Sequence, residues 1–157
     1  MNTALTERLR YLCDVVEQEV RHLQATDQRL FTQAFTVERV AALANDLEEA
    51  ERVDAFVARF GRLQDTTGDK LLPALLRYVG QTPGPALDNL HLAEKWGWVS
   101  DAQSWMYARQ LRNQMVHEYI KDAAVLCDAL NTGHDLVPLL TSTAQTLLLQ
   151  ARSRLPA

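Results

Sequence analysis

The sequence predicts an all-α fold, an up-and-down bundle of four main helices with short extra helices. Apolar residues recur at steps of three and four along most of the chain, which is the repeat of an amphipathic helix. No stretch has the two-residue alternation of a convincing strand, and the one strong loop signal in mid-chain is short. Because 157 residues are enough for one domain with a proper core, we expect residues 1–157 to form a single bundle.

The first half of the chain predicts three helices. The first ends at the polar residues 25–28, and its apolar stripe is Leu5, Leu9, Leu12, Val16, Val20 and Leu23. Thr36 is an N-cap residue for a long second helix, whose stripe runs from Val40 to Leu63. Polar residues 64–68 interrupt this pattern. A third helix is expected over residues 69–79, with Pro73 either in its first turn or at a kink.

The second half predicts a loop and three more helices. Residues 80–85, rich in glycine and proline, form the loop, and a short helix follows from Leu87 to residues 95–98. Ser100 with Gln103 has the pattern of a capping box. The helix behind it has the buried stripe Trp105, Ala108, Leu111 and Met115. A break near residues 131–133 precedes the last helix, in whose first turn Pro138 is tolerated.

The composition is that of an ordinary globular protein, with 47% apolar and 23% charged residues. A net charge of −4 argues against a surface coated with basic residues for bulk nucleic-acid binding, but it is compatible with a small local basic site. No apolar run approaches the ~20 residues that span a bilayer, and the amino terminus lacks a signal-peptide core. We therefore expect a cytoplasmic protein with no membrane partner.

Cysteines and histidines give little reason to expect a metal or redox centre. Cys13 and Cys127 lie far apart in apolar-periodic segments, which is typical of buried free thiols in a reducing compartment. His22, His91 and His134 are isolated, without a His-x3-His pattern or paired cysteines. The sequence therefore predicts no metal and no cofactor.

Aromatic and acidic residues also have ordinary explanations. Core aromatics are expected at Phe56, Phe60 and Trp105. Trp96 and Trp98 flank a glycine and are expected to cap the core, although stacking on a nucleotide is the alternative. The acidic run at residues 46–51 is interpreted as a solvated helix face; as a functional surface it would suit a basic protein partner better than RNA.

Residues 112–119 carry a cation, an amide, an imidazole and a phenol at Arg112, Asn113, His117 and Tyr119. In a helix Arg112 and Tyr119 share one face, and Asn113 and His117 share the neighbouring face. Arg112 and His117 are five residues apart and diverge by roughly 140° on a regular helix. Three arrangements stay open: the arginine reaches around the helix, the helix loosens near His117, or the two residues act across a dimer interface.

These residue types suit cleavage of RNA at its own 2′-hydroxyl, which needs a base, an acid and positive charge on the phosphorane. Histidine, with an ordinary pKa of about 6.5, offers both proton forms near neutrality. Arginine stays charged and presents a planar donor fork to phosphate oxygens. Arg109 and Lys121 could complete a small RNA-binding site, although a solvated helix face is the simpler interpretation of each. From the spacing alone, a solvated arginine and a histidine bonded to a carbonyl is the alternative.

The pattern Arg-x4-His-x-Tyr at residues 112–119 resembles the signature of the HEPN superfamily, and most closely its HepT-like branch. Residues 59–65 are similar to an Arg-Phe-x-x-Leu-Gln-Asp segment of many HepT-like proteins, and residues 71–76 follow where these proteins carry a like helix. Residues 88–97 look like the segment before the signature helix, which often contains Glu-Lys-x-Gly. The resemblance covers roughly residues 50–155, and the first 50 residues match mainly in helical character.

The resemblance implies a homodimeric, metal-independent endoribonuclease toxin of a toxin–antitoxin pair. Arg112 and His117 would cleave RNA at a dimer cleft, and Asn113 would hold the histidine or the phosphate. A nucleotidyltransferase antitoxin from the adjacent gene would adenylylate Tyr119. Two other functions stay open. One is a non-catalytic substrate-binding subunit of a two-component nucleotidyltransferase, and the other is a structural interaction module that keeps the motif for packing.

Overall fold

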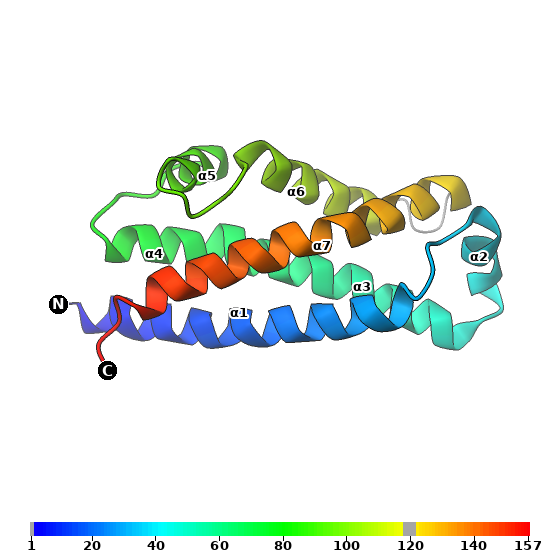
Figure 1. Ribbon diagram of the computed structural model, residues 1–157, viewed down its shortest axis with the longest axis horizontal. Coiled ribbons are helices and arrows are strands. Elements are labelled where there is room, and N and C mark those ends of the chain that lie inside the picture. The colour runs from blue at the N-terminus through cyan, green and yellow to red at the C-terminus, as the bar shows by residue number, and fades with distance from the viewer. Residues whose placement is uncertain (1, 118–121) are drawn as a thin grey trace.

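The computed structural model describes residues 2–117 and 122–157, without the side chain of His117. Every regular element in these residues is helical, and the long ones run alternately along the long axis of the molecule (Figure 1). The long segments are α1 (Thr3–Leu30), α3 (Leu47–Thr66) with its continuation α4 (Leu72–Tyr78), α6 (Ala102–His117) and α7 (Ala123–Arg152). The predicted all-α up-and-down bundle is therefore confirmed.

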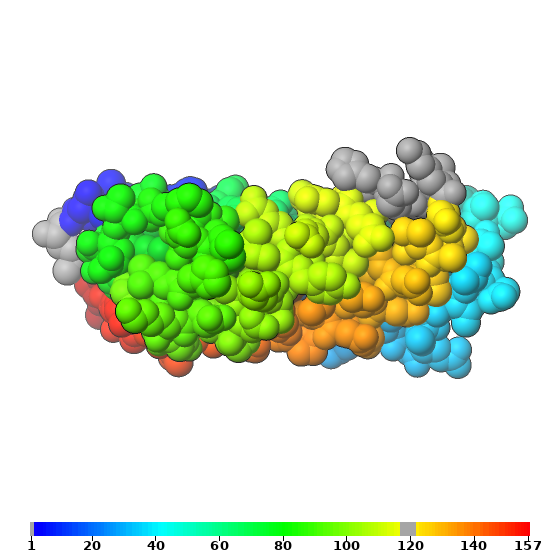
Figure 2. Space-filling view, turned by 90° about the horizontal axis from the view of Figure 1, so that it is seen from above, coloured from blue at the N-terminus to red at the C-terminus, as the bar shows by residue number. Residues whose placement is uncertain are grey.

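Two short helices complete the arrangement. α2 (Val37–Ala41) closes one end of the bundle, and α5 (Ala86–Lys95) lies near the other end, where the chain both begins and finishes (Figure 1). Seen from above, α5 and α6 form most of the surface, in green to yellow-green in Figure 2. α6 packs against α3 and α7, so one side of α6 faces the core while its outer side stays open.

The core is built from the apolar stripes that the sequence predicts. Leu9, Val16 and Leu23 of α1 are fully buried, and so are Phe56 and Phe60 of α3. The predicted stripe of α6 is buried throughout: Trp105, Ala108, Leu111 and Met115. Because truncating a buried aromatic side chain typically costs about 3–5 kcal/mol, these residues fix how the helices pack. The core positions predicted for the three aromatics are confirmed.

Polar residues end fewer helices than the sequence predicts. Residues 25–28 stay inside α1, because Thr26 accepts a hydrogen bond from the Arg59 side chain and Asp27 pairs with His134. Residues 131–133 stay inside α7, where Asn131 bonds the backbone N–H and carbonyl of Phe35. Both predicted breaks are wrong for one physical reason: partners distant in sequence satisfy the polar groups that would otherwise favour a turn.

The predicted second helix is divided. The Thr36 hydroxyl accepts the N–H of Arg39 at 3.1 Å, so the predicted N-cap is confirmed. The helix that it starts is short, however, and a 3₁₀ turn follows at residues 42–44. α3 begins afresh at Leu47, where the Asp46 carboxylate accepts the N–H of Glu49 at 3.1 Å. Part of the predicted acidic face therefore caps a helix, and Glu49 is also ion-paired with Arg39.

The predicted interruption at residues 64–68 is also wrong. α3 continues through Thr66 into a π-helical turn, Thr67–Leu71, which passes directly into α4. Gly68 in this turn lies so close to the indole of Trp105 that an added Cβ would stand 2.7 Å from its Nε1 atom. Pro73 lies in the first turn of α4 as one alternative predicted, whereas Pro138 lies inside α7 because α7 begins at Ala123.

Cys13 and Cys127 are free and buried, as predicted. Burial raises the pKa of both thiols, which keeps them in the unreactive protonated form. Trp98 is buried and Trp96 is partly exposed, with their ring centroids 4.9 Å apart in an edge-on arrangement. This pair caps the end of the core after α5, where Gly97 adopts a left-handed φ of 79°.

Within the described residues, no helix is long and apolar enough to cross a membrane.

Candidate functional site

The candidate site lies on α6, whose start is fixed by carboxylates. Asp101, directly before the helix, accepts the N–H of Gln103 at 3.0 Å and the hydroxyl of Ser104 at 2.6 Å. Those hydrogen bonds lower the pKa of Asp101, with the Ser104 contact as the largest cause. Glu94 of α5 accepts the N–H of Ala102 at 2.7 Å. The predicted capping box at Ser100 is therefore wrong by one residue, and Asp101 takes the capping role.

Arg112 is the best-oriented of the predicted site residues. Its Nη2 atom lies 3.1 Å from Oδ2 of Asp65 on α3, and its Nη1 atom donates to Oδ1 of Asn113 at 3.2 Å. Its aliphatic stem runs over Gly61, where an added Cβ would come within 3.2 Å of Cγ and 3.1 Å of Nε. A larger residue at this position would force the stem to shift by a few tenths of an ångström. Because the side chain keeps 36% of its exposure, donors of the guanidinium remain accessible to an anion.

A second arginine of α6 makes a similar but longer ion pair. Nη2 of Arg109 lies 3.7 Å from Oδ2 of Asp69. Asp65 and Asp69 are four residues apart, Arg109 and Arg112 are three apart, and α3 and α6 run in opposite directions (Figure 1). The two pairs therefore lie one after the other along the seam between the helices. Both pairs are more than one-third exposed, so solvent screens them and each adds little stability.

The two aspartates are the residues that sequence reasoning missed. Asp65 lies in the segment that resembles HepT-like proteins, but neither it nor Asp69 was expected in the site. One pattern in the sequence could have indicated them. Residues three or four apart lie on the same face of a helix, so Asp65 and Asp69 can face Arg109 and Arg112 on a neighbouring helix. Asn113, expected to hold the histidine or the phosphate, here accepts a hydrogen bond from Arg112.

Buried polar groups lie behind this seam. Gln64 is completely buried, and in the described part of the chain neither its amide oxygen nor its nitrogen has a hydrogen-bond partner. The hydroxyl of Thr67, in the π-helical turn, is also buried without a partner there. Glu19 of α1 accepts the Thr66 hydroxyl at 3.0 Å. Burial raises the pKa of Glu19, and the Thr66 hydrogen bond opposes this rise.

The remaining predicted site residues lie at or beyond the end of the described helix. His117 is the last residue of α6, and its side chain is outside the described part of the molecule. Tyr119 and Lys121 lie outside the described residues. The backbone of α6 is α-helical as far as His117.

The outer side of α6 carries no charge among the side chains that the structure describes. Its exposed residues are Gln103, Tyr107, Gln110, Asn113 and Gln114, and Tyr107 is 50% exposed. Val116 is 51% exposed, but it lies about 180° around the helix from Tyr107, on the side of Arg109 and Arg112. These arginines are turned towards α3, so they border the outer side without lying on it. Interface cores are depleted of charged residues and enriched in aromatic ones, and this side shares the lack of charge and has one exposed aromatic residue among amides.

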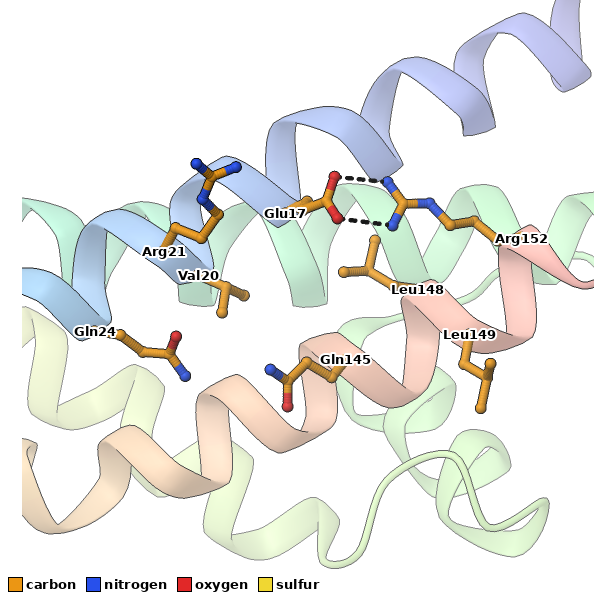
Figure 3. Close-up of a pocket in the computed structure, with 8 residues that line it drawn as sticks. All are labelled: Glu17, Val20, Arg21, Gln24, Gln145, Leu148, Leu149 and Arg152. Carbon is orange, nitrogen blue, oxygen red and sulfur yellow. Dashed lines mark hydrogen bonds and ion pairs between the residues drawn. The ribbon is translucent and has the colours of Figure 1, made fainter.

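No group of three or more His, Cys, Asp or Glu side chains among residues 2–116 and 122–157 is arranged to hold a metal ion. A hollow of about 390 Å³ lies between α1 and α7 (Figure 3). It is bordered by Glu17 and Arg152, which are joined by two hydrogen bonds. Its lining residues do not include Arg112. The hydrogen bonds from Arg152 join α7 to α1. They also lower the pKa of Glu17.

Comparison with protein-family models, with curated proteins and with solved structures gives no match to this chain.

Proposed function

We propose that this protein is a metal-independent endoribonuclease toxin of the HepT-like kind, which cuts RNA with Arg112 and His117 at a dimer cleft. The observation that carries the proposal is the orientation of Arg112. Asp65, Asn113 and the space above Gly61 fix its side chain, yet its guanidinium stays partly open to an anion. Prior orientation of this kind is what phosphate binding in a transition state needs.

In the proposed reaction the ribose 2′-oxygen attacks the adjacent phosphorus, and the bond from phosphorus to the 5′-oxygen breaks. A base takes the 2′-hydroxyl proton, and an acid gives a proton to the leaving 5′-oxygen. The products are a 2′,3′-cyclic phosphate and a 5′-hydroxyl. Arg112 of one chain would neutralise the phosphorane, and His117 of the partner chain would take the 2′-hydroxyl proton and then give a proton to the leaving 5′-oxygen. The chemistry requires no metal ion.

Dimer formation through α6 would resolve the divergence of Arg112 and His117. The outer side of α6, which carries no charge among the described side chains and on which Tyr107 is half exposed, supports an interface there. A two-fold axis near this surface would bring two motifs to one cleft. Arg112 borders the surface, because its pairing with Asp65 turns it to the side of the helix. RNA would then meet cations at the edge of the interface.

Tyr119 would be the point of control. We propose that a nucleotidyltransferase antitoxin transfers AMP to it: the phenol oxygen attacks the α-phosphorus of ATP, pyrophosphate leaves, and the phenol proton is released. The added phosphodiester would compete with RNA for Arg112. On co-expression with the neighbouring nucleotidyltransferase, we expect AMP on the peptide that contains Tyr119, and Tyr119→Phe should remain toxic. Equal rescue of this variant, with no AMP adduct on either protein, would show that simple binding is the mechanism.

One observation favours a non-catalytic role, either as a structural interaction module or as the substrate-binding subunit of a two-component nucleotidyltransferase. Arg109 and Arg112 are both paired with aspartates, as structural arginines usually are. A nuclease and a binding subunit differ in a direct assay. Purified protein is incubated with RNA in the presence of a chelator, and the product termini are identified by mass spectrometry.

We expect cleavage that leaves 2′,3′-cyclic phosphates. Loss of a proton-transfer group typically costs about 10²–10⁴-fold, and loss of a donor that stabilises transition-state charge costs about 10²–10³-fold, so His117→Ala and Arg112→Ala should each nearly abolish cutting in folded protein. Unchanged cleavage by His117→Ala, in a sample whose circular dichroism matches the parent, would overturn the nuclease assignment.

A further inference from the structure

A second cleft on this molecule is lined by arginines whose charges are largely unpaired. It lies between α1 and α3, which pack side by side (Figure 1), and encloses about 320 Å³. Arg29 comes from α1, and Arg52 and Arg59 come from α3. The other lining residues are Thr26, Glu48, Glu51 and Ala55. A volume of about 300–1,000 Å³ is usual for sites that take small ligands.

One of the three arginines is fixed in place. Nη1 of Arg59 donates to the hydroxyl of Thr26, which is 5% exposed, and to the carbonyl of His22 at 3.3 Å. These bonds use only one of its nitrogen atoms. Its remaining donors are held at the cleft. Binding of an anion would therefore cost this side chain less conformational entropy.

The other charged groups of the cleft have no partner of opposite charge. Among the described residues, no ion pair within 4.0 Å involves Arg29, Arg52, Glu48 or Glu51. Three arginines against two glutamates give the cleft a positive balance, in a chain whose net charge is −4. Unpaired guanidinium groups with free donor forks suit the oxygens of a phosphodiester.

The cleft is connected to the candidate site by exposed residues of α3. Arg59, Arg62 and Asp65 are each three residues apart, and Arg62 is exposed. Steps of three along a helix rotate by about 60° and rise by about 4.5 Å. The three residues therefore lie one after another around and along α3, from the cleft to Asp65, which is the partner of Arg112. A single strand of RNA bound at Arg112 could follow this path.

The mixed lining favours a nucleotide unit over a bare phosphate. Arginines would take the phosphate oxygens. Carboxylates of Glu48 and Glu51 would accept hydrogen bonds from a ribose 2′-hydroxyl or from a base amino group. Inorganic phosphate would use only the first of these contacts, and DNA would lack the 2′-hydroxyl contact.

We propose that the cleft formed by Arg29, Glu48, Glu51, Arg52 and Arg59 binds one nucleotide unit of an RNA strand, at a distance from the bond to be cut. The proposal rests on the proposed function for the identity of the strand as RNA. It goes further in assigning a second binding site, on the α1–α3 side of the molecule, that takes no part in the chemistry.

The test measures binding of a fluorescent single-stranded RNA by anisotropy, over a series of salt concentrations. All proteins carry His117→Ala, so the RNA stays intact. The test variant adds Arg29→Gln and Arg52→Gln. The matched control adds Arg21→Gln and Arg77→Gln, which remove the same charge from exposed arginines without ion pairs in the described structure. Circular dichroism verifies that each variant is folded.

We expect the test variant to bind RNA at least about tenfold more weakly, because loss of one charge-assisted hydrogen bond typically weakens binding by about tenfold or more. The slope of log K against log salt should fall by about 0.7 for each phosphate of a single strand that the variant no longer binds. The control should retain the parent affinity and slope. If RNA binding is weakened equally in the test and control variants, or is unchanged in both, the cleft is not an RNA-binding site.

A second comparison tests the glutamates. The ratio of RNA affinity to DNA affinity should fall in Glu48→Ala/Glu51→Ala, because both side-chain acceptors for the 2′-hydroxyl are removed. An unchanged ratio would overturn their assigned contact. The binding and cleavage assays test the two proposals separately. If RNA binding depends on the cleft but the parent protein does not cleave RNA, the cleft remains a binding site and the nuclease assignment is wrong. If the parent cleaves RNA but the cleft variants bind it normally, the nuclease assignment stands and the cleft is not a binding site.

Discussion

At the scale of single residues, the orientation of Arg112 depends on a missing side chain. Gly61 leaves the space through which the arginine stem passes on its way to Asp65. The contact is close, so a methyl group at this position must displace either the stem or the helix. Arg112 is partly exposed and free to move outward, which makes displacement of the stem the easier response.

Gly61→Ala should therefore separate activity from stability. The substitution adds helix propensity, by about 0.5–1 kcal/mol, and this gain offsets much of the packing strain. A misplacement of about 1 Å can cost up to 10²-fold in rate, so we expect cleavage to fall by about 10- to 100-fold with little change in melting temperature. Gly84→Ala is the control, because its new Cβ would meet nothing closer than 3.8 Å. Wild-type cleavage by Gly61→Ala would show that Arg112 does not need its observed path.

At the scale of elements, the contact between α1 and α3 contains a carboxyl group in an unfavourable environment. Glu19 accepts the Thr66 hydroxyl through Oε1, while Oε2 is buried and has no partner among the described residues. Burial raises the pKa of this carboxyl from its usual value of 4.5. The folded state therefore binds more protons than the unfolded state in this range, and the contribution of Glu19 to stability falls as pH rises from 4.5 through the raised value.

Glu19→Gln should stabilise the protein at pH 7.5 and have less effect at about pH 4, where the carboxyl is protonated in both states. The amide oxygen can still accept the Thr66 hydroxyl, and no charge is buried. Urea unfolding at the two pH values measures the difference. Glu7→Gln, an exposed position on the same helix, should change stability little at either pH. A loss of stability in Glu19→Gln at pH 7.5 that becomes smaller at about pH 4 would mean that the carboxylate is favourable there.

The elements also show how far local sequence determines this fold. Apolar periodicity was enough to predict most of the stripes of α1, α3 and α6, because burial of those residues is what the periodicity records. Leu47, which the predicted stripe of the second helix included, is the exception: it is 72% exposed at the start of α3. The cap at Thr36 was predictable because its chemistry is local. The continuity of α1 and α7 was not, because Asp27 and Asn131 are satisfied by His134 and Phe35, more than ninety residues away.

The candidate site follows the same rule. Arg109, Arg112 and Asn113 lie within one helix, and their spacing was enough to group them. Asp65 and Asp69 come from another helix, so only the fold brings them to the arginines. The roles of His117, Tyr119 and Lys121 remain predictions from the sequence.

At the scale of the whole molecule, Arg109 and Arg112 turn towards α3 at the edge of α6, and the outer surface of this helix carries no charge among the described side chains. Tyr107, 50% exposed, lies on this surface, and Tyr11, 59% exposed, lies on α1. The two residues form a matched pair for testing the proposed dimer.

Tyr107→Glu should convert the dimer into a monomer, since a charge in the core of an interface loses its hydration without gaining a partner. Tyr11→Glu should leave the dimer intact. Light scattering at micromolar concentration measures the mass of each. A parent protein that is monomeric under these conditions, or a dimer that survives Tyr107→Glu, would remove α6 as the interface.

The central claim is a composite site in which Arg112 of one chain works with His117 of its partner, and mixing two inactive variants tests it most directly. Arg112→Ala and His117→Ala proteins are unfolded together, refolded and assayed for RNA cleavage in a chelator. Random pairing makes about half of the dimers mixed, and a two-fold mixed dimer regains one intact site of two. The account therefore predicts about a quarter of the wild-type rate, from proteins that are each inactive alone. A mixture as inactive as its components, beside an active wild-type protein refolded in the same way, would contradict the composite site.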